Sequence, residues 1–554
     1  MIGVISKESE KETVREFFEL FKVPWEFYTE DRYYSVVIST LEALRGVDST
    51  FVVIYNSKKI KFDIENGVNI TSLPESSVQL KYRGYQFPIY GNISSFDTSI
   101  NTVTRLEAST GQVVGIEINK DDGKIIRIGF DLFQEINFLL TSGQSVNFAH
   151  IPTLDMHISI LREWILEFGL PLVEIPPIPA GYNFSCCLTH DIDFAGIRMH
   201  KFDLTILGFL YRASFDSLLH ALKGKISWTK LYENWKAVLL LPSVYAGLAK
   251  DFWMQFNSYT EVEENFPSTF FIIPFKNHAG ISNGNSKHAR RAARYDVSDV
   301  REEIQDLLSK GCEIGVHGID AWHATENGRK EFERIHEAIE TSEIGIRMHW
   351  LYFDDESPKF LEDAGFFYDS SVGYNDAIGY RGGTTQVYRP IGSKKLLELQ
   401  LNVQDTALFF PDRMALSEEE AWPLIDTLLD NAERYGGVLT INWHDRSLAP
   451  ERLWGNFYIK ILENLKKSKV WIDKAFQVVR WFDKRRSVLF EEVCFLEDRV
   501  KLHIVSKNDG DVPDLVLRIY LPKTGKVIDT NFSSLKEQHV DTHSTNFINA
   551  EIPI

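Results

Sequence analysis

The strongest constraint on the fold is a regular alternation of apolar, strand-like segments with helical segments between residues 181 and about 447. Three intervening segments have clear helix boundaries, with Ser or Asp at the start and Gly at the end: VSDVREEIQDLLSKG, SPKFLEDAG and SEEEAWPLIDTLLDNAERYGG. Strands that alternate with helices form a parallel sheet through right-handed crossovers. We therefore expect an α/β barrel or near-barrel of seven strands, at residues 184–193, 268–275, 312–318, 345–353, 365–373, 396–403 and 436–445.

The flanking regions have different patterns. Residues 1–180 mix helical and strand patterns and end at the proline-rich segment PLVEIPPIPAGY, which predicts a separate N-terminal α/β domain. From residue 486 to 554 the apolar residues recur with period two, which predicts a small β-sandwich-like module. The barrel domain then covers residues 181–485. Neither flanking region contains a chemical motif, so the sequence assigns them no role.

Composition excludes several classes of partner and location. The 554-residue chain has a formal charge of −18, which argues against nucleic acid as a partner. The longest apolar stretch, residues 237–249, contains a proline and is too short to cross a bilayer. The N-terminus has no basic start followed by a long apolar run, so we expect no secretory signal and a cytoplasmic protein. The four cysteines show no C-x-x-C spacing and are interpreted as core residues.

Polar residues gather at the ends of five of the expected barrel strands. In parallel α/β barrels the carboxyl ends of the strands form the rim on which active sites are built. Five polar strand ends at one rim are typical of a functional site. The residues are His190, Asp191 and Asp193; His317 and Asp320; Arg347 and His349; Asp369; and His444 and Asp445.

The strand ends that carry Asp191 and Asp193, His317, and His444 have the most specific chemistry. Asp191 and Asp193 are two residues apart on an extended strand, so their side chains point the same way. A divalent cation would relieve the repulsion between them and leave one carboxylate as ligand and the other as base. His317 and His444 could complete a hydrolytic metal site. Taken singly, His444 is more often a structural histidine, and Arg347 with Asp369 is more often a salt bridge.

The motifs THDID, EIGVHG, IRMHWL, YDSSVGYNDAIGYRGGT and INWHD resemble the polysaccharide deacetylase superfamily (carbohydrate esterase family 4), over residues 181 to roughly 480. The resemblance is to bacterial members of the HDxD type with extra N-terminal domains. It implies a distorted (β/α) barrel and metal-dependent hydrolysis of N-acetyl groups on a sugar or polysaccharide. By motif, Asp191 resembles the general base, Asp193 and His317 the first two metal ligands, Arg347 the residue that orients the base, and His444 the general acid. Asp369 is expected to tune a neighbouring histidine or contact substrate.

The chain departs from the family pattern at the third ligand. The common motif has a second histidine four residues after the first, and here that position is Ala321. We expect His323, six residues after His317, to be the third ligand, with Asp320 and His349 as alternatives. The metal is expected to be zinc, with cobalt, nickel or manganese as alternatives.

Two other functions stay open at this point. One is amide hydrolysis of a small molecule, which a deep pocket covered by residues 195–265 would favour. The other is a degenerate, non-catalytic carbohydrate-binding scaffold, against which the retained base and acid pair counts. Residues 195–265 are interpreted as a lid or packing element, and KHARRAARY (287–295) as a solvated loop.

Overall fold

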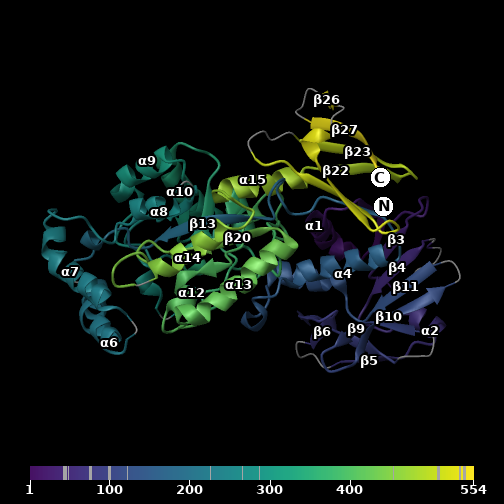
Figure 1. Ribbon diagram of the computed structural model, residues 1–554, viewed down its shortest axis with the longest axis horizontal. Coiled ribbons are helices and arrows are strands. Elements are labelled where there is room, and N and C mark those ends of the chain that lie inside the picture. Colours follow the sequence, from purple (N-terminus) through teal and green to yellow (C-terminus); the bar gives the residue numbers. More distant parts are fainter. Residues whose placement is uncertain are drawn as a thin grey trace.

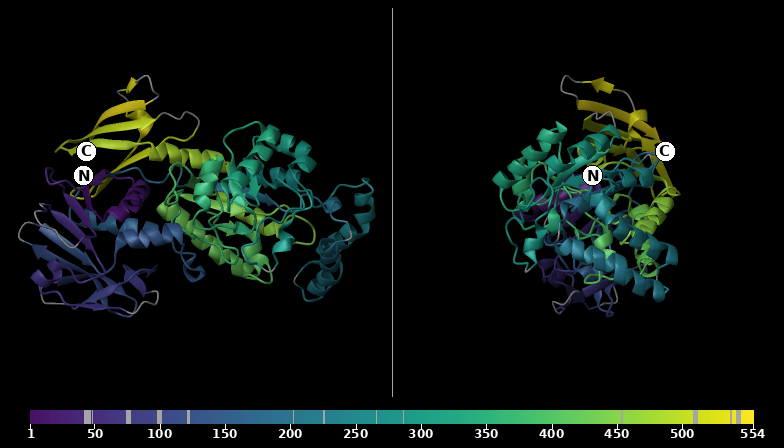
Figure 2. Two further views of the ribbon diagram at one scale, coloured as in Figure 1. Left: turned by 180° about the vertical axis from the view of Figure 1, so that it is seen from behind. Right: turned by 90° about the vertical axis from the view of Figure 1, so that its left-hand side faces the viewer.

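A computed structural model shows three parts arranged along one axis, with the barrel in the middle (Figure 1). The N-terminal domain and the C-terminal module lie together at one end, and a helical insertion forms the opposite end (Figure 2). The structure describes residues 1–554 except 42–46, 48, 74–77, 98–101, 121–122, 202, 225, 265, 286, 453, 508–511, 536–537 and 541–544. Among the helices it describes, none is long and apolar enough to cross a membrane.

The central domain contains a parallel sheet in the strand order β18-β17-β16-β15-β14-β13-β20-β19, with β21 also paired to β13. Every neighbouring pair in it is parallel. This confirms the predicted alternation and brings the carboxyl ends of the strands to one rim. The strands are β13 (Phe184–Ile192), β14 (Thr269–Ile272), β15 (Glu313–Gly318), β16 (Gly345–Met348), β17 (Tyr368–Asp369), β18 (Leu397–Glu398), β19 (Val403–Gln404), β20 (Val438–Asn442) and β21 (Val470–Ile472).

The two ends of the sheet order are joined by one segment of the chain. The expected strand 396–403 forms two short strands, β18 and β19, at opposite ends of the sheet order. Between them, Leu401 N–H donates to the carbonyl of Val372 at 2.9 Å, and Asn402 N–H donates to the carbonyl of Thr440 at 3.2 Å. The same segment therefore contacts β17 through its start and β20 through its end, with an irregular stretch between its two short strands.

Helices pack around the outside of the sheet, and the three predicted helices are present. Within the sheet, a glycine allows two neighbouring strands to come close. A Cβ at Gly345 would lie 2.0 Å from the Tyr368 ring, so only glycine allows β16 and β17 to approach this closely. The helices of this domain are α8 (Phe256–Glu263), α9 (Arg301–Ser309), α10 (Thr325–Ile339), α11 (Ser357–Ala364), α12 (Asp405–Phe409), α13 (Glu418–Tyr435), α14 (Gly455–Leu465) and α15 (Ala475–Arg486).

The N-terminal domain is α/β, as predicted. Its main sheet has the order β2-β1-β3-β4-β11-β10-β9-β6-β7, parallel from β2 to β11 and antiparallel from β11 to β7. The elements are β1 (Ile2–Ile5), α1 (Lys11–Phe21), β2 (Trp25–Phe27), β3 (Val36–Ser39), β4 (Phe51–Tyr55), α2 (Lys61–Glu65), β5 (Ile70–Ser72), β6 (Val78–Tyr82), β7 (Tyr85–Ile89), β8 (Ser94–Phe96), β9 (Thr102–Ala108), β10 (Val113–Lys120), β11 (Gly123–Ile128), α3 (Leu132–Thr141) and α4 (Thr153–Glu167).

The C-terminal module consists of two small sheets, and one of them contains a strand from far upstream. Strand β12 (Leu172–Glu174) pairs antiparallel with β24 (Val516–Leu521), which pairs with β25 (Lys526–Asn531). The other sheet has the order β22-β23-β27-β26. The expected boundary near residue 180 therefore places β12 in the N-terminal domain, whereas it pairs with the C-terminal module. The remaining strands are β22 (Leu489–Phe495), β23 (Arg499–Lys507), β26 (Gln538–Val540) and β27 (Thr545–Pro553).

Buried polar contacts join the N-terminal domain to the barrel domain. The fully buried Arg485 guanidinium, at the end of α15, donates to the carbonyls of Ile175 (2.7 Å) and Leu20 (3.0 Å) and to the side chain of Gln386 (3.1 Å). Asp155 in α4 accepts hydrogen bonds from Thr384 Oγ1 (2.8 Å) in the barrel domain. Unsatisfied buried groups are costly, so these contacts fix the parts relative to one another.

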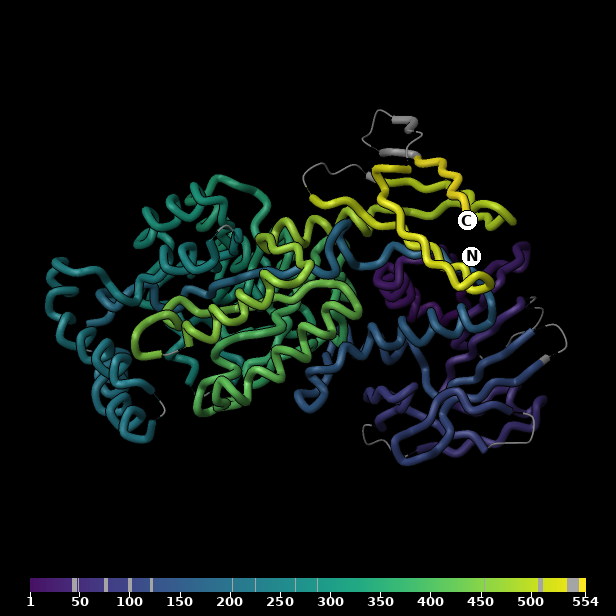
Figure 3. Tube along the Cα trace, in the orientation of Figure 1, coloured from purple at the N-terminus to yellow at the C-terminus, as the bar shows by residue number. Residues whose placement is uncertain are grey.

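The insertion between β13 and β14 is helical and has its own small core. It contains α5 (Leu204–Leu210), a π-helical turn (Tyr211–Asp216), α6 (Ser217–Leu222) and α7 (Trp228–Tyr245). Ile206, Phe209, Leu241, Val244 and Trp253 form a buried cluster separate from the barrel core. Figure 3 shows this segment in teal at the end of the molecule away from both termini.

Candidate active site

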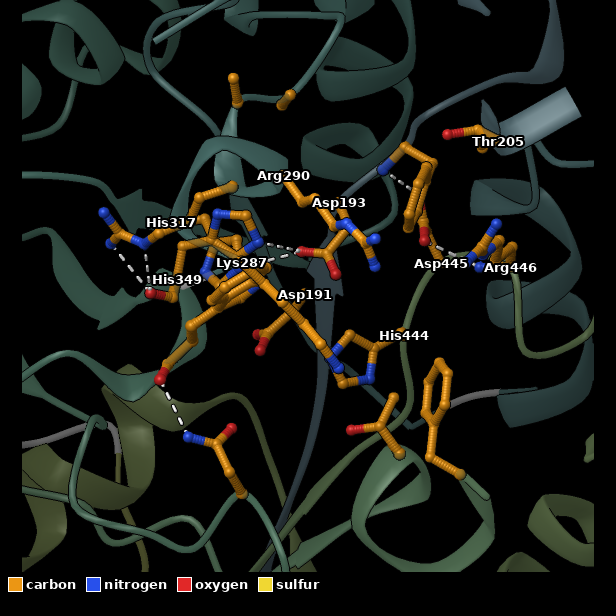
Figure 4. A pocket seen from close by; sticks show the side chains of 18 of the residues that line it. Asp191, Asp193, Thr205, Lys287, Arg290, His317, His349, His444, Asp445 and Arg446 are labelled. Atoms are coloured by element: carbon orange, nitrogen blue, oxygen red, sulfur yellow. Dashed lines mark hydrogen bonds and ion pairs between the residues drawn. The ribbon is translucent and has the colours of Figure 1, made fainter. Parts of the chain in front are cut away.

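A cavity of about 1180 Å³ opens at the rim formed by the carboxyl ends of the barrel strands. Its lining includes Asp191, Asp193, His317, His349 and His444. Figure 4 shows the two aspartates between the His317–His349 pair on one side and His444 on the other. The rim therefore gathers the side chains from β13, β15, β16 and β20 that the sequence pattern singled out.

Three of these side chains form a candidate metal centre. Asp193, His317 and His349 each offer one ligand atom, and the three atoms lie within 4.8 Å of one another. Asp193 Oδ1 is 3.2 Å from His317 Nε2 and 3.3 Å from His349 Nε2. Two imidazoles and one carboxylate form a donor set that suits zinc and several other first-row divalent metals.

The hydrogen bonding of His317 supports a cation at this point. Its Nδ1 lies 3.0 Å from the carbonyl oxygen of Arg347, which can only accept, so Nδ1 carries the hydrogen. Nε2 of the neutral ring then presents a lone pair to the Asp193 carboxylate, and two acceptors at this distance repel. A metal ion or a proton between them removes the repulsion, and a second-sphere carbonyl on the distal nitrogen is typical of metal-binding histidines.

His349 is a suitable third ligand because its buried ring is neutral. Burial lowers the pKa of His349 to about 3, so its ring is neutral and has a lone pair to donate. Its Nδ1 is buried without a hydrogen-bond partner in the part of the chain described.

The structure corrects the expected third ligand. His323 is exposed and lies outside the Asp193–His317–His349 group. Asp320 is engaged elsewhere, because it accepts from Ile281 N–H at 2.6 Å and lies 2.8 Å from His278 Nε2. The physical reason is the register of adjacent strands: β15 and β16 pair His317 with Arg347, so the chain brings His349 to the rim beside His317.

Asp191 is held as an ionised carboxylate. Its Oδ1 accepts from Arg347 Nη1 at 3.0 Å, and its Oδ2 accepts from Asn442 Nδ2 at 2.9 Å. Burial alone would raise the pKa of Asp191, but the charges of Arg347, His317 and His444 together outweigh burial and hold the pKa below its usual value. Asn442 was not predicted as a site residue, although it lies in the last predicted strand two residues before His444.

His444 is paired with a buried carboxylate. Its Nδ1 lies 2.5 Å from Asp405 Oδ1, and its backbone N–H donates to Asp405 Oδ2 at 2.8 Å. Burial alone would lower the pKa of His444, but Asp405 and the charges of Asp193 and Asp191 raise the pKa to about 9. Asp405 was missed in the sequence, where an acidic residue two positions after an expected strand end was the available signal.

Asp369 lies apart from this arrangement. It is fully buried, is not part of the cavity lining, and accepts from Ser371 N–H at 3.1 Å. Burial raises the pKa of Asp369 to about 6 beside the buried Glu398. The structure therefore gives Asp369 no contact with a site histidine, and its neighbour Ser370 contacts Arg347 instead, at 2.8 Å.

Strained turns and buried anchors support the rim. Ala195, two residues after Asp193, has φ of 55°, and Trp350, which follows His349, has φ of 65°. Left-handed backbone at such residues costs on the order of 1 kcal/mol and persists where the surroundings impose it. Asp445 stabilises the first turn by accepting from the N–H groups of Phe194 and Ala195, both at 2.8 Å.

The basic loop has a structural role that its composition concealed. Arg291 is fully buried and donates to the carbonyl oxygens of His349 (2.9 Å) and Ile319 (2.8 Å). It also stacks on Tyr352 at 4.1 Å. The interpretation of KHARRAARY as a solvated loop was therefore wrong for Arg291, which holds the backbone of the third candidate ligand.

Cationic side chains line the outer part of the cavity. Arg446 stacks on Phe194 at 3.7 Å, is only 9% exposed, and its Nη1 has no hydrogen-bond partner among the described residues. Glu451, also buried, contributes the nearest opposing charge to Arg446. The cations in the lining are Arg212, Lys287, Arg290, Arg291, Arg294, Arg413, Arg446 and Arg452.

No protein-family model matches the chain, and no curated protein is a significant match. Among solved structures, it is similar to a Mycobacterium smegmatis protein described as a polysaccharide deacetylase, at 18% identity over 56% of this chain and 95% of that one, with a TM-score of 0.34. It is also similar to PuuE allantoinase, at 14% identity over 55% and 92% of the two chains, with a TM-score of 0.33. A Pseudomonas aeruginosa PAO1 protein described as a polysaccharide deacetylase has 12% identity over 55% and 93%, with a TM-score of 0.35. At these values the function has to be inferred from the residues of the site itself.

Proposed function

We propose that the protein is a metal-dependent hydrolase that removes the N-acetyl group from a sugar. The observation that carries the proposal is the candidate metal group Asp193–His317–His349, which lines the same cavity as the Arg347-bound carboxylate of Asp191 and the Asp405-bound ring of His444. A metal-binding scaffold without catalysis needs neither the base nor the acid. Their places on two sides of one cavity support amide hydrolysis (Figure 4).

Asp193, His317 and His349 would hold a divalent metal, which would act as a Lewis acid towards the substrate carbonyl and would lower the pKa of water towards neutrality. The chain's own residues then handle the protons. Asp191, ionised and oriented by Arg347 and Asn442, accepts the proton of the attacking water. The C–O bond forms as this proton moves to Asp191.

His444 completes the reaction on the leaving group. With its Nδ1 hydrogen directed at Asp405, the protonated ring has its Nε2 hydrogen free to donate. As the C–N bond breaks, Nε2 gives a proton to the departing amine, so the products are acetate and an amino sugar. A pKa of about 9 keeps His444 protonated at neutral pH and therefore ready to act as the acid.

The first test is metal content, measured by elemental analysis on dialysed wild-type protein and on Asp193→Ala. We expect about one equivalent of zinc, cobalt, nickel or manganese in the wild type and its loss in Asp193→Ala. Asp191→Asn should keep the metal and lower acetate release from N-acetylated sugars by about 10²–10⁴-fold. Absence of metal in both proteins, even after metal is added back, would favour the binding-scaffold function instead.

A further inference from the structure

The outer surface of the insertion is apolar along two helical stripes. On α7, Trp228, Tyr232, Trp235 and Leu239 are spaced by four, three and four residues, so they lie on one face. They are 64%, 66%, 43% and 79% exposed. The opposite face of the same helix packs into the insertion core through Leu231, Leu241 and Val244, so packing within the fold does not explain the outer stripe.

The second stripe runs along α5 and the π-helical turn. Leu204, Leu207, Tyr211 and Phe215 are 78%, 59%, 56% and 57% exposed. The two stripes are neighbours, because Trp235 Nε1 donates to the carbonyl of Ser214 at 3.3 Å. Leu204 and Leu207 also line the catalytic cavity, so this apolar surface continues from solvent into the cavity.

The part of the insertion that carries the two apolar stripes has a charge opposite to that of the whole chain. Residues 195–250 contain eight lysines and arginines against three aspartates and glutamates, a net charge of +5, whereas the chain has −18. The exposed Lys223 and Lys236 flank the apolar stripes. Helices with Trp, Tyr and Leu on one face and lysines beside it are typical of segments that lie in the interface of an anionic membrane.

The position of the insertion in the molecule also favours contact with a membrane. It forms one end of the long axis, away from the N-terminal domain and the C-terminal module (Figures 1 and 2). A flat lipid surface can therefore contact it without meeting the other two parts. A second copy of the chain would bring another basic segment 195–250, including Lys223 and Lys236, against it, which opposes self-association through this face.

We propose that the insertion docks on an anionic lipid surface, and that the cavity takes its acetylated sugar from a lipid carrier to which a phosphate joins it. The sugar part rests on the proposed function, whereas the docking part does not. The apolar stripe that enters the cavity at Leu204 and Leu207 accommodates the start of the lipid chain. The lining arginines, including the incompletely paired Arg446, suit the phosphate.

The docking part is tested by flotation of the full chain with vesicles of phosphatidylcholine alone and of phosphatidylcholine mixed with phosphatidylglycerol. We expect binding to the mixed vesicles, weakened by salt. The double variant Trp228→Ser/Trp235→Ser should bind at least about tenfold more weakly, as should Lys223→Glu/Lys236→Glu. The control is Ile64→Ser on α2, another exposed apolar residue at 68%, which should bind like the wild type.

Each outcome tests either the docking proposal or the lipid-carrier proposal. Failure of the wild type to float, or equal flotation of all four proteins, overturns docking while acetate release from a soluble sugar still supports the proposed function. A concentration-dependent dimer that the Trp228→Ser/Trp235→Ser variant abolishes also overturns docking. For the carrier, a lipid-linked, phosphate-bearing acetylated sugar in mixed vesicles should be hydrolysed at least about tenfold faster than the free sugar, and only by protein that can float. Equal rates would overturn the lipid carrier and leave the hydrolase intact.

Discussion

The Asp405 carboxylate makes His444 suitable as an acid, although it need not touch the substrate. Its two oxygens are used by the His444 ring and backbone and by the Ser447 hydroxyl. Since the pKa of His444 is raised from 6.5 to about 9, the imidazolium–Asp405 pair contributes stability that is fully present below about pH 6.5. That contribution is lost as the pH rises through about 9.

The first prediction concerns this pair and the pH profile of activity. The wild-type rate should stay level up to about pH 9 and fall above it, because His444 must be protonated to donate. Asp405→Asn removes the charge, so the alkaline limb should move down by about one to three pH units. A full pH–rate profile measures this, and an alkaline limb that does not move in Asp405→Asn would assign the acid to another group.

The second prediction separates the two candidate third ligands. His349→Ala should lower metal affinity by at least about 10²-fold, because a buried ligand is lost from the group. His323→Ala should bind metal like the wild type, since His323 is exposed and lies outside the group. Competition with a chelator, followed by elemental analysis, compares the two proteins. A larger loss of metal affinity in His323→Ala than in His349→Ala would identify His323 as the third ligand.

The site residues that stand at the ends of strands could be predicted from the sequence. Asp191, Asp193, His317, Arg347 and His444 follow apolar runs in the sequence, and the structure brings them to one rim. His349 could not be chosen over His323 from sequence, because the choice depends on the cross-strand register. Asp369 also ends a strand, yet it lies outside the cavity lining, because a strand end alone does not determine which way a side chain points.

At the scale of elements, the loop that carries Arg291 supports the β16 end of the rim. Arg291→Ala removes the donors to the carbonyl of His349, so the third candidate ligand loses its backbone anchor. We expect metal affinity to fall by about 10–100-fold, as for other residues that orient ligands. The neighbouring Arg290→Ala is the control, because Arg290 is exposed. Unchanged affinity in Arg291→Ala would show that the strand alone holds His349.

Helices and strands with a clear period of apolar residues were predicted well, and segments without such a period were not. The helices α9, α11 and α13 end at or just before a glycine, and Ser417 caps the start of α13, so local chemistry specifies these boundaries. The segment 396–403 has the composition of one strand, but its ends pair with opposite sides of the sheet. Long-range pairing of this kind leaves no local signal in the sequence.

At the scale of the whole molecule, Arg485 tests whether the N-terminal domain and the barrel domain form one unit. Arg485→Ala leaves the carbonyls of Ile175 and Leu20 without their donor in a buried place. We expect a loss of about 3 kcal/mol or more in the free energy of unfolding, measured by denaturant titration. The control is Arg499→Ala, whose side chain is 44% exposed, with an expected change within about 0.5 kcal/mol. Equal effects of the two substitutions would mean that the parts fold independently.

Strand β12 has a consequence for the order in which the chain is made. Leu172 pairs with Tyr520, so the first strand of this sheet leaves the ribosome long before its partner exists. At about 5–20 residues per second, the delay is roughly 20–70 seconds. During that time β12 has an unpaired edge of the kind that chaperones bind. Synthesis of β24, rather than completion of the barrel, therefore sets the earliest moment at which the newborn chain can bury this edge.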